Sequence, residues 1–217
     1  MKLTDQTLAV LKNFASINSS CVFKAGNIIK TVPTSRRLLA SHKLEESLPV
    51  DFAIYDLSRF LSVAGLLGNP ELEFHEHYVE MIGENNSVKY GFSDPSLIDG
   101  ADYNKVFNID SPVAETELSQ GKLQKIRQAS QILSAPNISI VGNGKTINLV
   151  VHDANNKSSD RYNILLGETS SNFKVDTTID QFKLLPDDYS VVISDNIIVK
   201  CVGNFVEYTL ACDIAVE

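Results

Sequence analysis

The stretch TDQTLAVLKNFASIN, Thr4 to Asn18, predicts an amphipathic helix, and two short β runs follow it at 21–24 (CVFK) and 28–33 (IIKTVP). The second half of the chain repeats this order. There SQGKLQKIRQASQILS, Ser119 to Ser134, predicts a helix, and two β runs follow at 138–141 (ISIV) and 146–152 (TINLVVH). This repetition indicates two similar domains, a pattern more typical of a ring or an array than of a single active-site cleft.

Each half then continues with a second helix and three more β runs. In the first half, Phe52 to Leu57 is expected to open a helix over 55–66, and in the second half a shorter helix is expected over 178–185. The β runs alternate apolar and polar residues, which favours antiparallel sheets with helices on one side, an α+β fold. They are 71–75, 78–82 and 87–92, then 189–194, 197–202 and 205–212. We predict domains 1–108, with a linker from about 93, and 109–217.

Composition narrows the class of protein. The chain has 217 residues, 43% of them hydrophobic, which is enough for two cores. It shows no apolar run of signal-peptide or membrane-spanning length, so we expect no membrane association. Cys21, Cys201 and Cys212 lie in β runs without CxxC spacing, which predicts buried free thiols of a cytosolic protein.

Charge is distributed unevenly along the chain. The net charge is −8, which argues against nucleic acid wrapped on the outer surface. The four candidate helices (4–17, 55–66, 120–134 and 178–185) nevertheless hold six basic and three acidic residues, and the remainder holds 13 basic and 24 acidic ones. Positive charge therefore collects on the helices.

The outward helix faces are rich in Lys, Arg, Gln, Asn and Ser. In the third helix, which Ser119 should cap, Gln124, Lys125, Gln128 and Gln131 face outward, with Lys122 and Arg127 at the flanks. Such faces are commonly just solvated surface. Because they recur at equivalent places, they also suit a phosphate backbone that is contacted without reading bases.

Several segments resemble the sliding clamps of T-even-type bacteriophages. They are MKL (1–3), LKNFA (11–15) with INS (17–19), DFAIYDL (51–57) with Phe60-Leu61, and FKLLPDDY (182–189). The resemblance spans the whole chain and its order of elements, and it is strongest in the first 20 residues and around 51–61.

The resemblance implies a DNA polymerase processivity factor that is not an enzyme and has no cofactor or metal. Three subunits would close a ring of six clamp domains around duplex DNA, with helices lining the hole and acidic sheets forming the outer wall. Matching positions imply a DNA-facing set, from which the acidic Asp5 on the first helix departs. That set is Lys12, Asn13, Arg59, Lys122, Lys125, Arg127 and Lys183.

The resemblance also implies partners. They are double-stranded DNA bound without sequence preference, the DNA polymerase, a clamp-loader ATPase and late-transcription factors, in the cytoplasm of an infected bacterium. Partner peptides would dock near the linker, 93–111. The subunits would pair through edge strands near 87–92 and 161–167. The expected interface residues are Tyr90, Phe92, Tyr162, Ile164 and Leu165.

Other signals are weaker. GNGKT (142–146) ends like a phosphate-binding loop, but it joins two β runs, so we predict a hairpin turn. His75 and His77 could share a metal but lack a third ligand, so exposed strand residues are expected. We interpret Glu45-Glu46 and Asp187-Asp188 as solvated loop acids. The alternative function is an acidic, β-rich virion or assembly protein that forms a ring without DNA.

Overall fold

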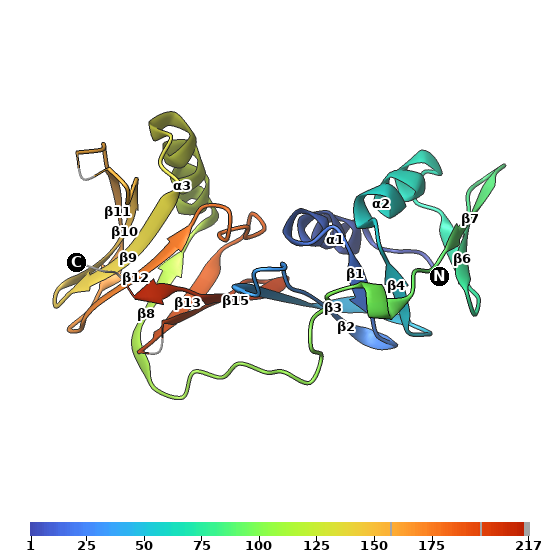
Figure 1. Cartoon of the computed structure of the whole chain (residues 1–217), viewed down its shortest axis with the longest axis horizontal. Coiled ribbons are helices and arrows are strands. Elements are labelled where there is room, and N and C mark those ends of the chain that lie inside the picture. The colour runs from blue at the N-terminus through green and yellow to red at the C-terminus, as the bar shows by residue number, and fades with distance from the viewer. Residues whose placement is uncertain (157, 196, 215–217) are drawn as a thin grey trace. The chain divides into compact units, whose positions relative to one another are not determined.

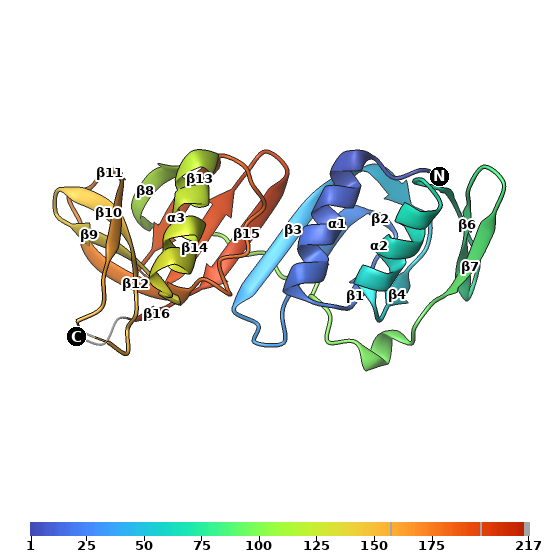
Figure 2. The ribbon, with the colours of Figure 1, turned by 90° about the horizontal axis from the view of Figure 1, so that it is seen from above.

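The structure is a computed structural model, and it describes residues 1–156, 158–195 and 197–214. The chain forms two compact units, Met1–Lys105 and Val106–Glu217. The boundary falls inside the segment 93–111 that was expected to link two domains. Both units are α+β, with helices packed beside antiparallel sheets (Figures 1 and 2).

The first unit contains two α-helices that lie side by side. Its strands pair antiparallel as β1 with β4, β2 with β3, and β5-β6-β7 in a three-stranded sheet. Its elements are α1 (Asp5–Ile17), β1 (Cys21–Phe23), β2 (Gly26–Thr31), β3 (Leu38–Leu48), β4 (Phe52–Ile54), α2 (Leu57–Leu66), β5 (Glu71–Phe74), β6 (Tyr78–Ile82), β7 (Ser87–Gly91) and the 3-10 turn η1 (Pro95–Leu97).

The second unit places α3 against β10 and β11. Its strands form a five-stranded sheet in the order β11-β10-β9-β12-β16, and four more pair in the order β15-β14-β13-β8. Its elements are β8 (Pro112–Leu118), α3 (Gln120–Leu133), β9 (Asn137–Asn143), β10 (Thr146–His152), β11 (Tyr162–Glu168), β12 (Asn172–Thr178), β13 (Tyr189–Ser194), β14 (Ile198–Val202), β15 (Val206–Ala211) and β16 (Asp213–Ile214).

The apolar periodicity of the sequence explains where each core lies. In α1, Val10 and Phe14 are fully buried one turn apart, because residues spaced by three or four share a helix face. In β10, Ile147, Leu149 and Val151 are fully buried, because alternate residues of a strand share a sheet face. Each helix therefore turns its apolar side to a sheet and leaves its polar side outward.

At the N-termini of α1 and α3, N–H groups donate hydrogen bonds to a carboxylate from another segment of the same unit. Glu46 on β3 accepts hydrogen bonds from the Thr4 backbone N–H and from the Thr7 hydroxyl, the latter at 2.8 Å. Asp188 accepts one from the Gln120 N–H at 2.7 Å. A negative group there satisfies N–H donors that lack a partner within the helix and complements the helix dipole. Ser119 caps α3, as predicted, by accepting from the Lys122 N–H.

The helix expected over 178–185 is absent, so this prediction was wrong. Strand β12 continues to Thr178, one turn follows, and the chain then runs without regular structure to β13. A stretch of eight residues is marginal as a helix, and Pro186 disfavours the helical conformation at the residue before it. Phe182 and Leu184 are nevertheless 2% and 0% exposed, so the apolar pattern still marks the core.

The helix expected to open at Phe52 begins later. Phe52–Ile54 is strand β4, paired with β1, and α2 starts at Leu57 after the N-cap Asp56. Three consecutive buried residues can form a short strand as readily as a helical turn. The ring of Phe52 stacks on Phe23 with centroids 4.5 Å apart, and this cross-strand contact favours the strand.

The interpretation of the paired acids as solvated loop residues was wrong for Glu45, Glu46 and Asp187, whereas Asp188 is exposed and lies just before β13. Glu45 and Glu46 lie within β3, and Glu46 holds α1. Asp187 is 7% exposed and accepts hydrogen bonds from the backbone and side-chain amides of Asn204 at 2.6 and 2.7 Å. The carboxylates of Glu46 and Asp187 therefore join separate segments of the fold.

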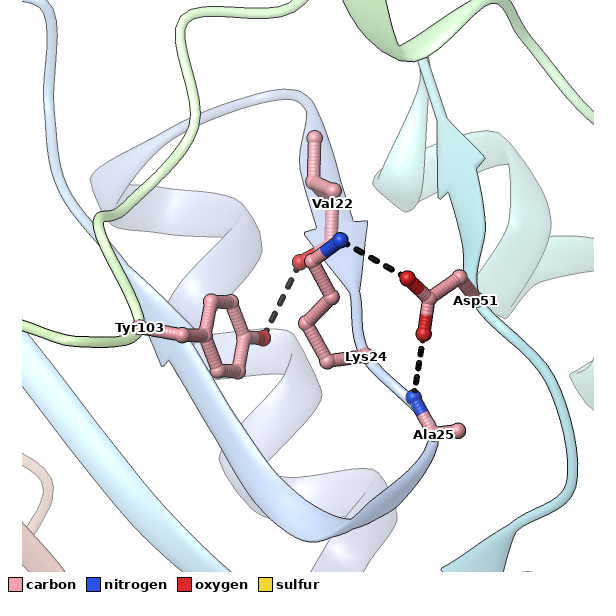
Figure 3. Close-up of polar contacts among 5 residues, drawn as sticks. All are labelled: Val22, Lys24, Ala25, Asp51 and Tyr103. Atoms are coloured by element: carbon pink, nitrogen blue, oxygen red, sulfur yellow. Dashed lines mark hydrogen bonds and ion pairs between the residues drawn. The ribbon is translucent and has the colours of Figure 1, made fainter.

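Hydrogen bonds hold the linker residues Tyr103 and Lys105 against the first unit, and Figure 3 shows the contact of Tyr103. The hydroxyl of Tyr103 donates to the Val22 carbonyl at 3.0 Å and accepts from the Lys30 N–H at 3.1 Å. The ammonium of Lys30, a buried residue, donates to the carbonyls of Tyr103 and Lys105, both at 3.0 Å. Nearby, Asp51 accepts from the Lys24 ammonium and the Ala25 N–H.

All three cysteines are free and buried, as predicted. Burial raises the pKa of the Cys21 thiol to about 12, which makes this thiol unreactive near neutral pH. Among the helices of the described residues, none combines the length and the hydropathy that a membrane span requires.

The contact between Glu46 and α1 predicts a pH-dependent stability. Burial raises the pKa of the Glu46 carboxyl, but the hydrogen bonds from Thr4 and Thr7 lower it by more than burial raises it. The pKa of this carboxyl therefore lies below its usual value. Glu46→Gln should therefore lower the free energy of unfolding by about 1 kcal/mol at pH 7 in urea titrations.

The stabilisation by a carboxyl with a lowered pKa is complete above its unfolded pKa and is lost as the pH falls through the folded one. The difference between the two proteins should thus shrink below about pH 4. Glu45→Gln, a neighbour on the same strand, is the control and should change little. A constant difference from pH 7 to pH 3 would contradict the role given to the charge.

Candidate nucleic-acid interface

The exposed helix faces are the most distinctive surface of the chain. The described helices carry five basic residues, Lys12, Arg59, Lys122, Lys125 and Arg127, and a single acidic one, Asp5. In the whole chain acidic residues outnumber basic ones by 27 to 19. This distribution of charge suits binding of an anionic polymer to the helices, since the acidic remainder of the surface would repel it.

On α1 the outward face consists of Asp5, Ala9, Lys12 and Ser16. Their spacing of four, three and four places them in one row along the helix. Lys12 is exposed and Asn13, at the side of the row, is half-buried. The Ser16 hydroxyl donates to the Asn13 carbonyl at 2.6 Å, so it is engaged with its own helix.

On α2 the basic residue lies beside a strand edge. Arg59 is exposed and helps to line an open groove between α2 and β7, together with Val63 and Tyr90. The hydroxyl of Tyr90 donates to the Asp56 carbonyl at 3.2 Å, and its ring meets Phe60 edge-to-face at 5.3 Å. Arg59 thus belongs to the helix face and also to the rim of this groove.

On α3 the three predicted basic residues differ from one another. Lys125 is exposed and Lys122 is half-buried. Arg127 turns towards the segment after β12, where its guanidinium donates to the Leu184 carbonyl, and burial lowers the pKa of that guanidinium. The same segment is held by Tyr189, whose hydroxyl donates to the Leu185 carbonyl at 2.6 Å. Arg127 is therefore engaged inside the unit, and Lys125 is the more available cation.

Lys183 lies in the irregular segment that replaces the expected fourth helix, and it is half-buried. The structure therefore brings Lys122 and Lys125 together on α3, and it places Lys183 on a separate element of the same unit. Lys12 and Arg59 lie on the two neighbouring helices of the first unit.

The predicted interface residues lie on or near two sheet edges. Strand β7 is the last strand of its sheet, and β11 is the last strand of the five-stranded sheet. Tyr90, Tyr162 and Ile164 are half-buried, and Leu165 is 56% exposed. Phe92 lies beyond β7, and its ring stacks on Phe52 with centroids 5.1 Å apart, so it packs within its own unit.

Other clusters do not assemble a reactive site. The Ser139 hydroxyl lies between His152, 2.7 Å from its Nε2, and Asp176, to which it donates. In nucleophilic catalysis the imidazole lies between the serine and the acid, and here the serine holds that place. His75 stacks on Tyr78, and the described residues contain no group of three side chains able to hold a metal ion. The segment 142–146 forms the predicted hairpin turn, with Gly144 at φ +76°.

Two exposed apolar residues were missed at the level of sequence. Leu66 on α2 is 78% exposed and Ile132 on α3 is 81% exposed. Both depart from the buried stripe of their helix, which was the available signal. Tyr55, which is 64% exposed, lines the same groove as Arg59.

Comparison with known proteins gives consistent matches. The family model for DNA polymerase processivity factors matches residues 3–89. The chain is 32% identical to a sliding clamp of Vibrio phage KVP40, covering 98% of this chain and 99% of that protein. It is 29% identical to the sliding clamp of Escherichia phage RB69, covering 98% and 97%. The crystal structure of the proliferating cellular nuclear antigen of Entamoeba histolytica superposes with a TM-score of 0.72 at 16% identity, with 98% of each chain covered.

The position of Arg127 predicts a structural effect. Arg127→Ala removes the guanidinium that the Leu184 carbonyl accepts from, so it should lower the free energy of unfolding by about 1–3 kcal/mol in urea titrations. Lys125→Ala, exposed on the same helix, is the matched control and should stay within about 0.5 kcal/mol of the unchanged protein. Equal stability of both variants would show that the contact contributes nothing to the fold.

Proposed function

Because this chain belongs to the sliding clamps of T-even-type bacteriophages, a family of DNA polymerase processivity factors, we propose that it encircles duplex DNA and holds the replicative polymerase to it. The observation that carries the proposal is the 32% identity to a phage sliding clamp along essentially the full length of both chains. The exposed cationic helix faces support it, because these are the surfaces that the clamp arrangement would turn to DNA.

The clamp acts through topology and does no chemistry of its own. A closed ring stays on DNA without a tight grip, so the contacts to phosphates can be weak, independent of sequence and compatible with sliding. Lys12 and Lys125, exposed and flanked by neutral polar side chains, supply contacts of this kind. Arg59, Lys122, Asn13 and Lys183 complete the proposed set, and Arg127 supports the fold behind it.

The ring consists of three copies of the chain. Two unlike edges, β7 in one unit and β11 in the other, supply the ends of a head-to-tail contact that closes after three subunits. Pairing of β7 with β11 of the next copy would satisfy the free backbone groups of both edges. Tyr90, Tyr162, Ile164 and Leu165 flank this contact.

The partners follow from the same function. A clamp-loader ATPase opens the ring and places it on DNA in the cytoplasm of the infected bacterium. The polymerase, and late-transcription factors after it, bind through peptides near the linker 93–111. Tethering converts the return of a released polymerase into an intramolecular step at high effective concentration, so a modest affinity gives processive synthesis.

Retention on DNA tests the topological claim. After loading by the phage's own loader ATPase, the protein should stay on nicked circular DNA through gel filtration and be lost from the same DNA once it is linearised. Blocking both ends of the linear DNA with bound protein should restore retention. Equal loss from circular and linear DNA would contradict the clamp proposal. It would favour a protein that binds the DNA surface, or the alternative function of a ring that forms without DNA.

Charge reversal tests the helix faces. Lys12→Glu and Lys125→Glu should weaken binding to duplex DNA, and the slope of log affinity against log salt should fall by about 0.9 for each phosphate that is no longer neutralised. Lys43→Glu on β3 and Lys145→Glu in the β9–β10 hairpin make the same charge change in the same units, away from the helices. These two controls should keep the original slope. A similar weakening in all four would point to net charge instead of the helix faces.

A further inference from the structure

An open groove with an aromatic floor and an acidic rim lies in the first unit, next to the start of the linker. Its walls come from three places, which are the start of β4, the turn between β5 and β6, and the segment that follows β7. The side chains that matter for a ligand are Asp51, Phe52, Glu76, His77, Phe92 and Asp94. None of them belongs to an α-helix, so the groove is separate from the candidate DNA surface.

Backbone hydrogen bonds hold the walls of this groove together. The Phe92 N–H donates to the His77 carbonyl, and the Ser93 N–H donates to the Ala53 carbonyl, both at 2.9 Å. The segment after β7 therefore joins the β5–β6 turn to β4. Because its walls are tied by the main chain, the groove is part of the fold itself.

The floor of the groove consists of phenylalanine rings. Phe92 is half-buried, and its ring stacks on Phe52 with centroids 5.1 Å apart. The ring of Phe52 also packs against Phe23 and Phe74, with centroids 4.5 and 5.2 Å away. Phe52 is only 6% exposed, so Phe92 offers the larger open aromatic surface. The face of such a ring attracts a cation.

Carboxylates surround this floor. The side chain of Glu76 is 88% exposed, Asp94 is exposed, and Asp51 completes the rim. Asp51 already accepts a hydrogen bond from the Lys24 ammonium at 2.7 Å, so Glu76 and Asp94 are the acids available to a ligand. Among the described residues that line the groove, none is lysine or arginine. The groove is therefore complementary to a cation and repels an anion.

Resting on the proposed role as a tether, we propose that this groove binds an arginine side chain of a partner protein. A guanidinium is planar, so it can stack on Phe92 while its N–H groups donate to Glu76 and Asp94, which a lysine ammonium does less well. The acidic rim excludes a phosphate backbone, so the partner is a protein segment. Leu97, 72% exposed on η1, offers an apolar contact to an aliphatic side chain beside that arginine.

A tryptophan in the floor gives a direct readout, because the chain contains none of its own. Phe92→Trp keeps an aromatic ring there, and its fluorescence is followed at pH 8, where histidine is ordinarily neutral. The probe is the peptide acetyl-Gly-Leu-Arg-Leu-Gly-amide, and the control peptide carries citrulline, which has the shape of arginine without its charge. The dissociation constant of the arginine peptide should be about fivefold lower or less, because ring and rim both act on the charge.

Substitutions of the rim test its charge. Glu76→Gln together with Asp94→Asn should bring the arginine peptide close to the citrulline value, because the amides keep the shape of the rim. Glu73→Gln together with Glu84→Gln removes the same charge from exposed positions outside the groove and should leave the affinity unchanged. Isothermal titration calorimetry of the protein with its natural Phe92 repeats the comparison without the reporter. Equal binding of the two peptides, or equal weakening by both double variants, would overturn the proposal.

The remaining outcomes identify other occupants and separate the groove from the clamp. A lysine peptide that binds as tightly as the arginine peptide would refute the stacked guanidinium. A change of emission as the protein alone is concentrated would mean that a second copy occupies the groove, which also refutes the proposal. If the arginine peptide fails to bind while the protein is retained on circular DNA, the groove is refuted and the clamp stands. Specific peptide binding by a protein that is lost from circles would refute the clamp alone.

Discussion

The structure depends on the burial of one apolar stripe of each helix against an antiparallel sheet. Burying a side chain such as Phe14 or Ile126 contributes roughly 1.5–3 kcal/mol, and each helix buries several. Once that stripe is fixed, the opposite face of the helix is fixed too, because the period of 3.6 residues leaves no freedom to rotate it. The side chains on the outward face then decide which molecules the protein can bind.

Apart from Asp5 on α1 and the exposed Leu66 and Ile132, the outward faces hold mainly cations and neutral polar groups, and most acids lie elsewhere. Several acids serve the framework itself: Glu46 and Asp188 bind the N-termini of α1 and α3, and Asp187 joins the β13 and β15 ends of its unit through Asn204. Carboxylates at helix N-termini offset the positive end of the helix dipole within the fold. The positive charge left on the surface is therefore that of lysine and arginine side chains.

The two units repeat a plan without being equal. The first unit presents two α-helices, and the second presents one helix and an irregular segment held by Arg127, Tyr189 and Tyr208. Each unit also has a sheet edge, β7 in the first and β11 in the second. Two unlike edges in one chain suit a head-to-tail assembly, which the proposed encirclement of DNA requires.

Local sequence determined α1 and α3 with the two strands after each, their buried stripes, the cap at Ser119 and the free cysteines, because these follow from periodicity and residue chemistry. It also indicated the family, through the segments at 1–19 and 51–61. The tertiary structure alone decided that 178–185 is not a helix, since packing buries Phe182 and Leu184 in an irregular backbone. It alone turned Arg127 inward, because contacts between distant segments are not encoded in local spacing.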